Sequence, residues 1–331
     1  MNAGSVAPVH GGPDALGAVA HDFSTNANGC GPCPAALDAL QAADASRYPD
    51  PAYAALRERL ACFHGVEAGR IVPAASASEF IFRITAAVAR TGGRRLLLPR
   101  YAYGDCVRAA RTWAFEAAAG PHDADLAWCC DPSSPLGQPT VAPADLVRAL
   151  RADATCVLDL AYEPLRLEGE SGWPAALRNR VWQLWTPNKA LGLTGIRAAY
   201  AIAPLASQLP SLVAAMAPSW PVGAHGVALL EAWTGTAAQH WLSRSRVVLA
   251  DWKAQQGAIC SALGWQCLPG VANFFCARPD RPLTPDRVAA LRAVGVQLRD
   301  TASFGLEGHV RLGVLAPASQ QALADGWRAV A

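Results

Sequence analysis

The sequence predicts an α/β fold in which a mainly parallel, doubly wound sheet forms a large domain beside a smaller α+β domain. Short apolar runs alternate with helical segments over the first two thirds of the chain, a pattern typical of parallel strands joined by helices. From about Val222 this alternation gives way to a long helical stretch and then to mixed elements. A large buried core is expected, because 52% of the 331 residues are hydrophobic and only 16% are charged.

The elements of the first two thirds of the chain follow from these runs in chain order. Short apolar runs predict strands, and apolar residues at helical spacing predict the helices between them. Pro49 and Pro51 place a rigid loop before the second helix, because two prolines cannot lie inside a helix. The expected strands are residues 70–73, 95–98, 126–130, 156–160, 181–185 and 198–203, and the expected helices are residues 34–45, 52–64, 79–90, 103–114 and 143–152.

The remainder of the chain predicts a smaller α+β domain joined by a long helix. We expect an extended N-terminal arm over residues 1–22, a large domain over 46–245, and a small domain built from 23–45 and 246–331. Helical segments are expected at residues 228–233, 237–263, 284–294 and from Pro317, and strand-like segments at 273–277, 295–299 and 309–314.

Charge and hydropathy exclude several classes of function. The net charge is +2 and basic residues do not cluster, which argues against a nucleic-acid partner. The longest uncharged run, residues 198–224, is interrupted by prolines, so we expect no membrane span. The first residues lack the features of a signal peptide, so a cytoplasmic protein is expected.

The cysteines are expected to be reduced core residues in a chain of this kind. Cys30 and Cys33 form a C-G-P-C motif of the thioredoxin type. That chemistry needs an exposed first cysteine at a helix N-terminus after a strand, whereas this pair follows a turn-rich stretch. A chance spacing is favoured, and a redox protein stays as an alternative. No second C-x-x-C or histidine pair completes a zinc site, so no metal is expected.

Ligands of open α/β sheets bind beyond the carboxyl ends of strands, so polar residues that follow the predicted strands are candidate site residues. Lys189 follows the strand at 181–185 among small residues, which suits a lysine that forms a Schiff base. Thr186 and Arg197 lie near enough in sequence to surround a phosphate. The alternative is a surface lysine in a glycine-rich loop.

Asp159 ends a run that should be a buried strand. A buried carboxylate needs a cationic partner, and a protonated pyridine nitrogen is such a partner. The alternative is an aspartate that caps the N-terminus of a helix.

Other strands are followed by further candidates. Ala77 and Ser78 open a helix after the strand at 70–73, where backbone N–H groups bind phosphate, although Ser76 and its neighbours could be an ordinary helix cap. Tyr101 follows the strand at 95–98 and could stack on a flat ring or pack in the core. Ser134 lies in the polar loop after the strand at 126–130.

Taken in order, these features resemble the fold-type I pyridoxal-phosphate enzymes, the aspartate-aminotransferase superfamily. The similarity covers nearly the full length and is greatest to the histidinol-phosphate aminotransferase branch. It implies pyridoxal 5'-phosphate as the cofactor, with Lys189 as the Schiff-base lysine, Asp159 beneath the pyridine nitrogen and Arg197 on the phosphate.

The resemblance also implies roles for the remaining candidates. Tyr101 would stack on the cofactor ring, Tyr162 would bind its 3′-oxygen, and Ala77, Ser78 and Thr186 would hold its phosphate. Tyr48 matches a tyrosine that reaches the phosphate of the partner subunit, which implies a homodimer. The chain departs from the family at Ser134, usually Asn, at Asn188, usually Ser, and at Leu160, usually acidic.

The N-terminus narrows the resemblance to L-threonine-O-3-phosphate decarboxylases of cobalamin biosynthesis. His10, in a His-Gly-Gly motif, and the segment 22–28 resemble the opening of that subfamily, and Arg299 resembles a substrate-binding arginine. Arg311 matches the arginine that binds a substrate carboxylate. The resemblance implies decarboxylation of L-threonine O-3-phosphate to (R)-1-amino-2-propanol phosphate. The alternatives are a histidinol-phosphate-type aminotransferase and a non-catalytic protein with this fold.

Overall fold

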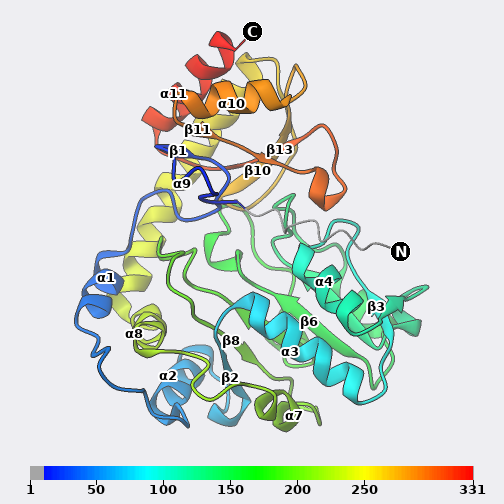
Figure 1. Cartoon of the computed structure of the whole chain (residues 1–331). Helices are drawn as coiled ribbons and strands as arrows, with labels where there is room; N and C mark the ends of the chain where they lie inside the picture. Colours follow the sequence, from blue (N-terminus) through cyan, green and yellow to red (C-terminus); the bar gives the residue numbers. More distant parts are fainter. Residues whose placement is uncertain (1–10, 331) are drawn as a thin grey trace.

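A seven-stranded sheet forms the centre of the larger part of the molecule (Figure 1). The computed structural model describes residues 11–330. Neighbouring strands from β7 to β4 are parallel, whereas β8 is antiparallel to both β2 and β7. The prediction of a mainly parallel sheet is therefore confirmed. In spatial order the strands are β2 (Ile71–Ala74), β8 (Ala199–Ile202), β7 (Trp182–Trp185), β6 (Thr155–Asp159), β5 (Leu126–Cys130), β3 (Arg95–Leu97) and β4 (Glu116–Ala117).

Both faces of this sheet are buried. Along β5, Leu126 and Trp128 join one hydrophobic core, whereas Ala127 and Cys129 join another. Because successive side chains of a strand point to opposite faces, two separate cores mean that helices cover both faces, as the doubly wound prediction requires. The sequence did not predict β4, because its two residues are exposed and form no apolar run.

The helices of the larger part lie close to the predicted segments. At the start of α3 (Ala77–Arg90) the Ser76 side chain accepts a hydrogen bond from the Glu79 N–H and so caps the helix, and most apolar residues of the helix are buried. Short helices α6 and α7 were not predicted. The remaining bounds are α1 (Pro34–Gln41), α2 (Ala54–His64), α4 (Gly104–Thr112), α5 (Pro143–Ala149), α6 (Ala175–Arg178), α7 (Pro210–Ala215) and α8 (Ala224–Trp233).

A long helix connects this part to the C-terminal part. In α9 (Thr236–Ala262) the buried residues Leu242, Ser245, Leu249 and Gln256 recur at helical spacing, so one face packs inward along its length. The helix contacts α1 and α8 near its start and α11 (Pro317–Ala329) further along. None of the helices within residues 11–330 is long and apolar enough to cross a membrane.

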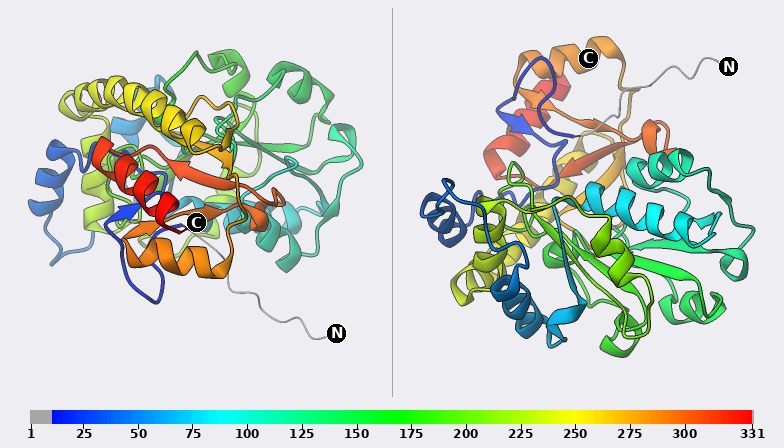
Figure 2. Two further views of the ribbon diagram at one scale, coloured as in Figure 1. Left: turned by 90° about the horizontal axis from the view of Figure 1, so that it is seen from above. Right: turned by 60° about the horizontal axis from the view of Figure 1, so that its bottom comes forward.

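The C-terminal part is a four-stranded antiparallel sheet with two covering helices, which Figures 1 and 2 place at one end of the molecule. The expected strand at 295–299 is instead two short strands, β11 and β12, which join different sheets. The spatial order is β12 (Arg299–Asp300), β13 (Val310–Gly313), β10 (Phe274–Arg278) and β9 (Gln266–Cys267), and the helices are α10 (Pro285–Ala293) and α11.

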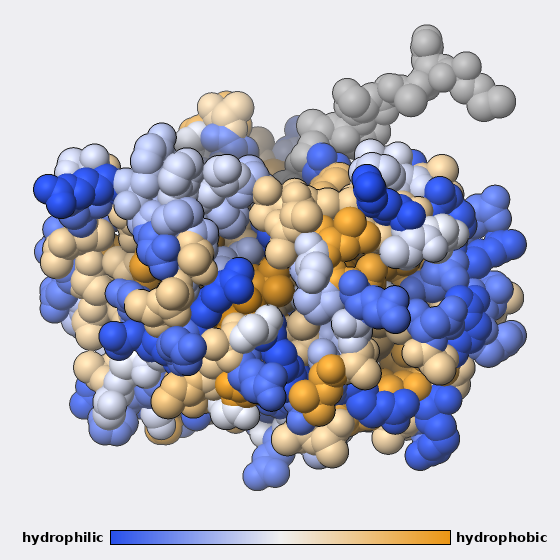
Figure 3. Space-filling view, turned by 90° about the horizontal axis from the view of Figure 1, so that it is seen from below, coloured by the Kyte–Doolittle hydropathy of each residue, from blue (hydrophilic) through white to orange (hydrophobic). Residues whose placement is uncertain are grey.

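The described part of the N-terminal segment is paired to this C-terminal part. Strand β1 (His21–Asp22) runs parallel to β11 (Val296–Gln297), and Arg292 forms an ion pair with Asp14 at 2.9 Å. After it, α1 packs against α8 and α9. The domain limits that we infer from the sequence stay a prediction. On the face that Figure 3 shows, hydrophobic residues are scattered among hydrophilic ones.

Candidate active site

Several of the predicted site residues follow strands that end at one edge of the seven-stranded sheet. Strands β2, β3, β5, β6 and β7 run in the same direction, so their carboxyl ends meet at that edge. Asp159 is the last residue of β6, and Lys189 follows β7 after a short loop.

A small pocket brings three of the predicted residues together. Tyr101, Ser134 and Asp159 all line it, although they follow three different strands. Tyr103 and Cys130 also line it, and the sequence had suggested neither of them as a site residue. The pocket walls are otherwise mostly apolar, which is the environment that a flat aromatic ring requires.

Asp159 is poised to pair with a cation. Burial raises the pKa of its carboxyl group, and this effect is opposed by the Ala161 N–H, which donates to Oδ1 at 2.9 Å, and by the charge of Lys189. A raised pKa means that the carboxylate lacks full compensation for its lost hydration. A protonated pyridine nitrogen would supply that compensation.

Lys189 lies close enough to this carboxylate for its charge to act on it, and its side chain is only partly exposed. Its Nζ lies 5.2 Å from the ring centroid of Tyr162, whose hydroxyl accepts a 3.4 Å hydrogen bond from Asn26. The N-terminal segment supports the lysine loop, because the Asn28 N–H donates to the Lys189 carbonyl at 2.9 Å. The sequence motif included Asn28, but nothing in it indicated this supporting role.

The region around the start of α3 fits a phosphate. Ala77 and Ser78 form the first turn of this 14-residue helix, whose N–H groups favour an anion. Thr186 Oγ1 is buried and has no hydrogen-bond partner among residues 11–330, so a donor is left for a ligand. The Tyr103 hydroxyl lies 3.4 Å from Ser78 Oγ, and burial raises the pKa of Tyr103 to about 12, so it remains protonated at neutral pH.

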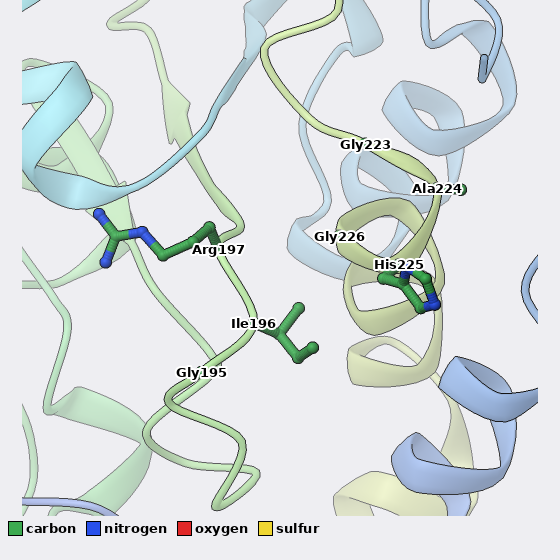
Figure 4. A pocket seen from close by; sticks show the side chains of 7 residues that line it. All are labelled: Gly195, Ile196, Arg197, Gly223, Ala224, His225 and Gly226. Atoms are coloured by element: carbon green, nitrogen blue, oxygen red, sulfur yellow. The ribbon is translucent and has the colours of Figure 1, made fainter. Parts of the chain in front are cut away.

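Two other predicted cofactor-binding residues, Asn188 and the phosphate-binding candidate Arg197, have different surroundings. Asn188 is buried, and its amide donates weakly to the carbonyls of Thr194 and Ile196, so it shapes the loop after the lysine. Arg197 is exposed and borders a hollow of about 340 Å³. Figure 4 shows Ile196 and His225 pointing toward this hollow, whereas the Arg197 guanidinium extends to the other side of its loop.

Two predicted substrate-binding arginines lie on the C-terminal sheet, and one of them, Arg311, reaches a residue that lines the pocket. Arg311 Nη1 lies 3.4 Å from Ser134 Oγ, and its Nη2 donates to the Ser24 carbonyl at 3.0 Å. Arg299 Nη2 donates to Ser303 Oγ at 2.7 Å. Both arginines are buried. His10, the third predicted substrate-binding residue, lies outside the described residues.

Tyr48 is not brought to the pocket within one chain. Its side chain is 77% exposed and stacks on Trp220 with ring centroids 4.3 Å apart. The Trp220 indole N–H donates to the Pro49 carbonyl at 3.0 Å, which holds the pair on the surface. Nothing in the sequence pattern indicated Trp220 as the neighbour of Tyr48.

The C-G-P-C motif lacks the geometry of a redox centre. Cys33 is fully buried at the N-terminus of α1, and Cys30 is partly buried with its Sγ 3.8 Å from the Ser245 carbonyl. Burial raises the pKa of Cys30, whereas a redox nucleophile needs a lowered one. In the part of the chain that the structure describes, no three His, Cys, Asp or Glu side chains are grouped to hold a metal ion.

Comparisons with known proteins identify relatives over most of the chain. The family model "Aminotransferase class I and II" matches residues 114–329. Histidinol-phosphate aminotransferase 1 of Bradyrhizobium diazoefficiens is 28% identical over 313 residues, covering 88% of this chain and 87% of that protein. The histidinol-phosphate aminotransferase of Symbiobacterium thermophilum is 26% identical over 335 residues, covering 93% and 91%.

Solved structures show the same fold. Histidinol-phosphate aminotransferase from Sinorhizobium meliloti, in complex with pyridoxal-5'-phosphate, has a TM-score of 0.78 and 21% identity, covering 98% of this chain and 96% of that one. L-threonine-O-3-phosphate decarboxylase from Porphyromonas gingivalis has a TM-score of 0.75 and 22% identity, covering 93% and 98%.

Asp159 at the end of β6, the partly exposed Lys189 and the unpartnered Thr186 hydroxyl after β7 fit one cofactor. The predicted aspartate-aminotransferase-like fold and the predicted cofactor are thereby confirmed. The individual roles of the site residues stay predictions. The chain belongs to the class I and II aminotransferase family, the fold-type I enzymes that use pyridoxal 5'-phosphate.

Proposed function

We propose that this protein decarboxylates L-threonine O-3-phosphate to (R)-1-amino-2-propanol phosphate, a reaction of cobalamin biosynthesis. The observation that carries the proposal is the pair of buried arginines, Arg299 and Arg311, at the substrate side of the pocket. Two cationic groups suit a substrate with both a carboxylate and a phosphate. The sequence resemblance around residues 10–12 and 299 supports the same substrate.

Each side chain near the cofactor would have a separate role in this reaction. When bound, pyridoxal phosphate supplies an electron sink for the bond broken at the substrate Cα. Asp159 would hold the proton on the ring nitrogen and stabilise the charge that develops there. Lys189 Nζ would bind the cofactor and later return a proton to Cα, and Tyr162 would orient the ring through its hydroxyl.

The direction in which the arginines hold the substrate would decide which bond breaks. A decarboxylase must place the Cα–carboxylate bond perpendicular to the ring, releasing CO2 and placing a proton on Cα, whereas an aminotransferase breaks Cα–H. Tight pairing of the departing carboxylate stabilises the ground state. We therefore assign most of the arginine contacts to the phosphate, which is not lost.

The holoenzyme is expected to release CO2 from L-threonine O-3-phosphate without an added keto acid, because the electrons of the broken bond return to Cα as a C–H bond. Trapped CO2 and the amine product are measured together. L-Threonine is the control, because it lacks only the phosphate, and its turnover should be far slower. The proposal fails if turnover requires 2-oxoglutarate and yields glutamate.

That contrary result would support a second candidate, a histidinol-phosphate-type aminotransferase. The names of the sequence relatives favour it, because the matched proteins are called histidinol-phosphate aminotransferases. Its phosphorylated substrate would use the same two arginines. Supplying histidinol phosphate with 2-oxoglutarate, and measuring glutamate, separates the two candidates.

We also propose that the enzyme is a homodimer in which Tyr48 binds the phosphate of the partner's cofactor. Its 77% exposure in a single chain leaves the hydroxyl available to a second copy. Tyr48→Phe keeps the ring stacked on Trp220 and is expected to weaken cofactor binding about ten- to hundredfold, the effect of one hydrogen bond to a charged group.

Cofactor affinity is measured by absorbance titration, and the mass of the particle by sedimentation. Activity at saturating cofactor should stay near that of the wild type, which controls for misfolding. A fully active monomer, or an unchanged affinity in Tyr48→Phe, would contradict the shared site.

A further inference from the structure

We propose that Phe304 is a positioning residue that holds the guanidinium groups of Arg299 and Arg311 side by side, and so makes the site specific for amino acids that carry a second anionic group. The inference rests on the proposed function in taking these two arginines as the substrate-binding pair. No pattern in the sequence indicates a role for this aromatic residue.

The backbone places the two arginines opposite each other. Arg299 in β12 and Arg311 in β13 are cross-strand partners in an antiparallel pair, so their side chains leave the sheet on the same face. Like charges at such positions repel each other. This repulsion affects the pKa of Arg299, which is lowered mainly by burial and to a smaller extent by the charge of Arg311.

The ring of Phe304 lies near both of these like charges. The guanidinium carbon of Arg299 is 5.0 Å from the centre of its ring, and that of Arg311 is 5.6 Å from it. An aromatic face attracts cations within this range, so one ring contacts both charges. The guanidinium carbon of Arg311 also lies 5.8 Å from the ring centre of Phe274, so this guanidinium contacts a second aromatic ring.

The loop that carries Phe304 is held in place before any ligand binds. Phe304 ends the short helical turn η4 (Ala302–Phe304), and Gly305 follows it with a positive φ of 82°. Thr301 is fully buried, and its hydroxyl is within hydrogen-bond distance of the carbonyls of Leu306, at 2.6 Å, and His309, at 2.9 Å. These contacts close the loop on itself, so the ring position is set by the fold.

Arg311 contacts neutral groups, whereas the negative charge of Asp300 offsets part of the effect of Arg311 on the pKa of Arg299. Arg311 donates to a carbonyl and lies near a hydroxyl, and among residues 11–330 it forms no ion pair. Arg299 donates to the Ser303 hydroxyl and to the Asp300 carbonyl. A ligand with two anionic groups relieves the repulsion between the guanidiniums, whereas a ligand with one leaves part of it in place.

The test compares two probes on the holoenzyme, O-phospho-L-threonine and L-threonine, which differ only in the phosphate. Binding is followed by the change in cofactor absorbance, and inorganic phosphate serves as a competitor. The quantity of interest is the ratio of the two dissociation constants, because a general loss of structure changes both constants alike.

We expect Phe304→Leu to reduce the preference for the phosphorylated probe about tenfold, since the aromatic face is lost to both cations. Phe304→Tyr retains that face and should keep the preference. Phe82→Leu is the matched control, because Phe82 faces Arg108 at 5.5 Å outside the pocket. In Phe304→Leu, KM for the phosphorylated substrate should rise more than kcat falls.

An unchanged ratio in Phe304→Leu overturns the inference, as does a wild type that binds both probes equally. If Phe304→Leu does not fold, the same ratio of dissociation constants is measured for Phe304→Met, because methionine fills a similar volume without an aromatic face. Failure of the proposed function is distinguishable: the preference then depends on Phe304, yet no CO2 is released from O-phospho-L-threonine.

Discussion

Lys189→Ala is expected to abolish turnover, with a loss of at least about 10³-fold, because in the proposed mechanism this one amine would both bind the cofactor and move the proton. Lys189 lies at the carboxyl edge of the sheet, close enough to Asp159 for their charges to interact. The wild-type protein should be yellow, and borohydride should attach the cofactor permanently to this lysine. Mass spectrometry of the reduced protein measures the site of attachment.

The chain provides its own control for that experiment. The sequence contains one other lysine, Lys253, which forms an ion pair with Glu168 at 2.8 Å. Lys253→Ala should keep its colour, its labelling and its activity. An adduct on Lys253, or labelling that survives in Lys189→Ala, would remove the basis for the assigned cofactor lysine.

Asp159→Asn is expected to lower kcat of the holoenzyme about 10²- to 10³-fold, in line with the loss of one partner from a buried ion pair. The amide has the shape of the carboxylate but cannot stabilise a protonated ring nitrogen. Cofactor affinity should fall as well. Kinetics at saturating cofactor and an absorbance titration measure the two effects separately, and Asp153→Asn, at an exposed aspartate beside Arg151, is the control.

Asp159→Asn, which should lower kcat, is expected to increase the stability of the cofactor-free protein. Burial raises the pKa of Asp159 above its value in the unfolded chain, so the folded state binds this proton more tightly. Stability is therefore lost as the pH rises from the unfolded pKa, about 3.9, through the folded one. Cofactor-free Asp159→Asn should melt at a higher temperature than the wild type near neutral pH, and the advantage should shrink below about pH 4. A lower melting temperature at neutral pH would show that the carboxylate is already compensated.

The sequence alone was sufficient for the large sheet and for the part of the site built on it. Each predicted strand of that sheet is present within two residues at each end, because a strand buried on both faces requires a continuous apolar run. The positions of Asp159 and Lys189 follow from the same pattern, since parallel strands bring the residues after their carboxyl ends to one edge. The short strand β4 could not be predicted, because it is exposed and its pairing depends on β3.

Only the tertiary structure decided the contacts between distant segments. Strand pairing, which no local sequence pattern encodes, sets Arg299 opposite Arg311. The same pairing positions the loop that brings the Phe304 ring near both guanidinium groups. The support of the lysine loop by Asn28 joins segments about 160 residues apart. Local propensity and periodicity determine which segments form strands and helices, whereas the direction and partners of a side chain depend on packing among all of them. The sequence thus determined the sheet edge at which the predicted cofactor residues Asp159 and Lys189 meet. Tertiary packing decided how Arg299 and Arg311 are arranged beside each other.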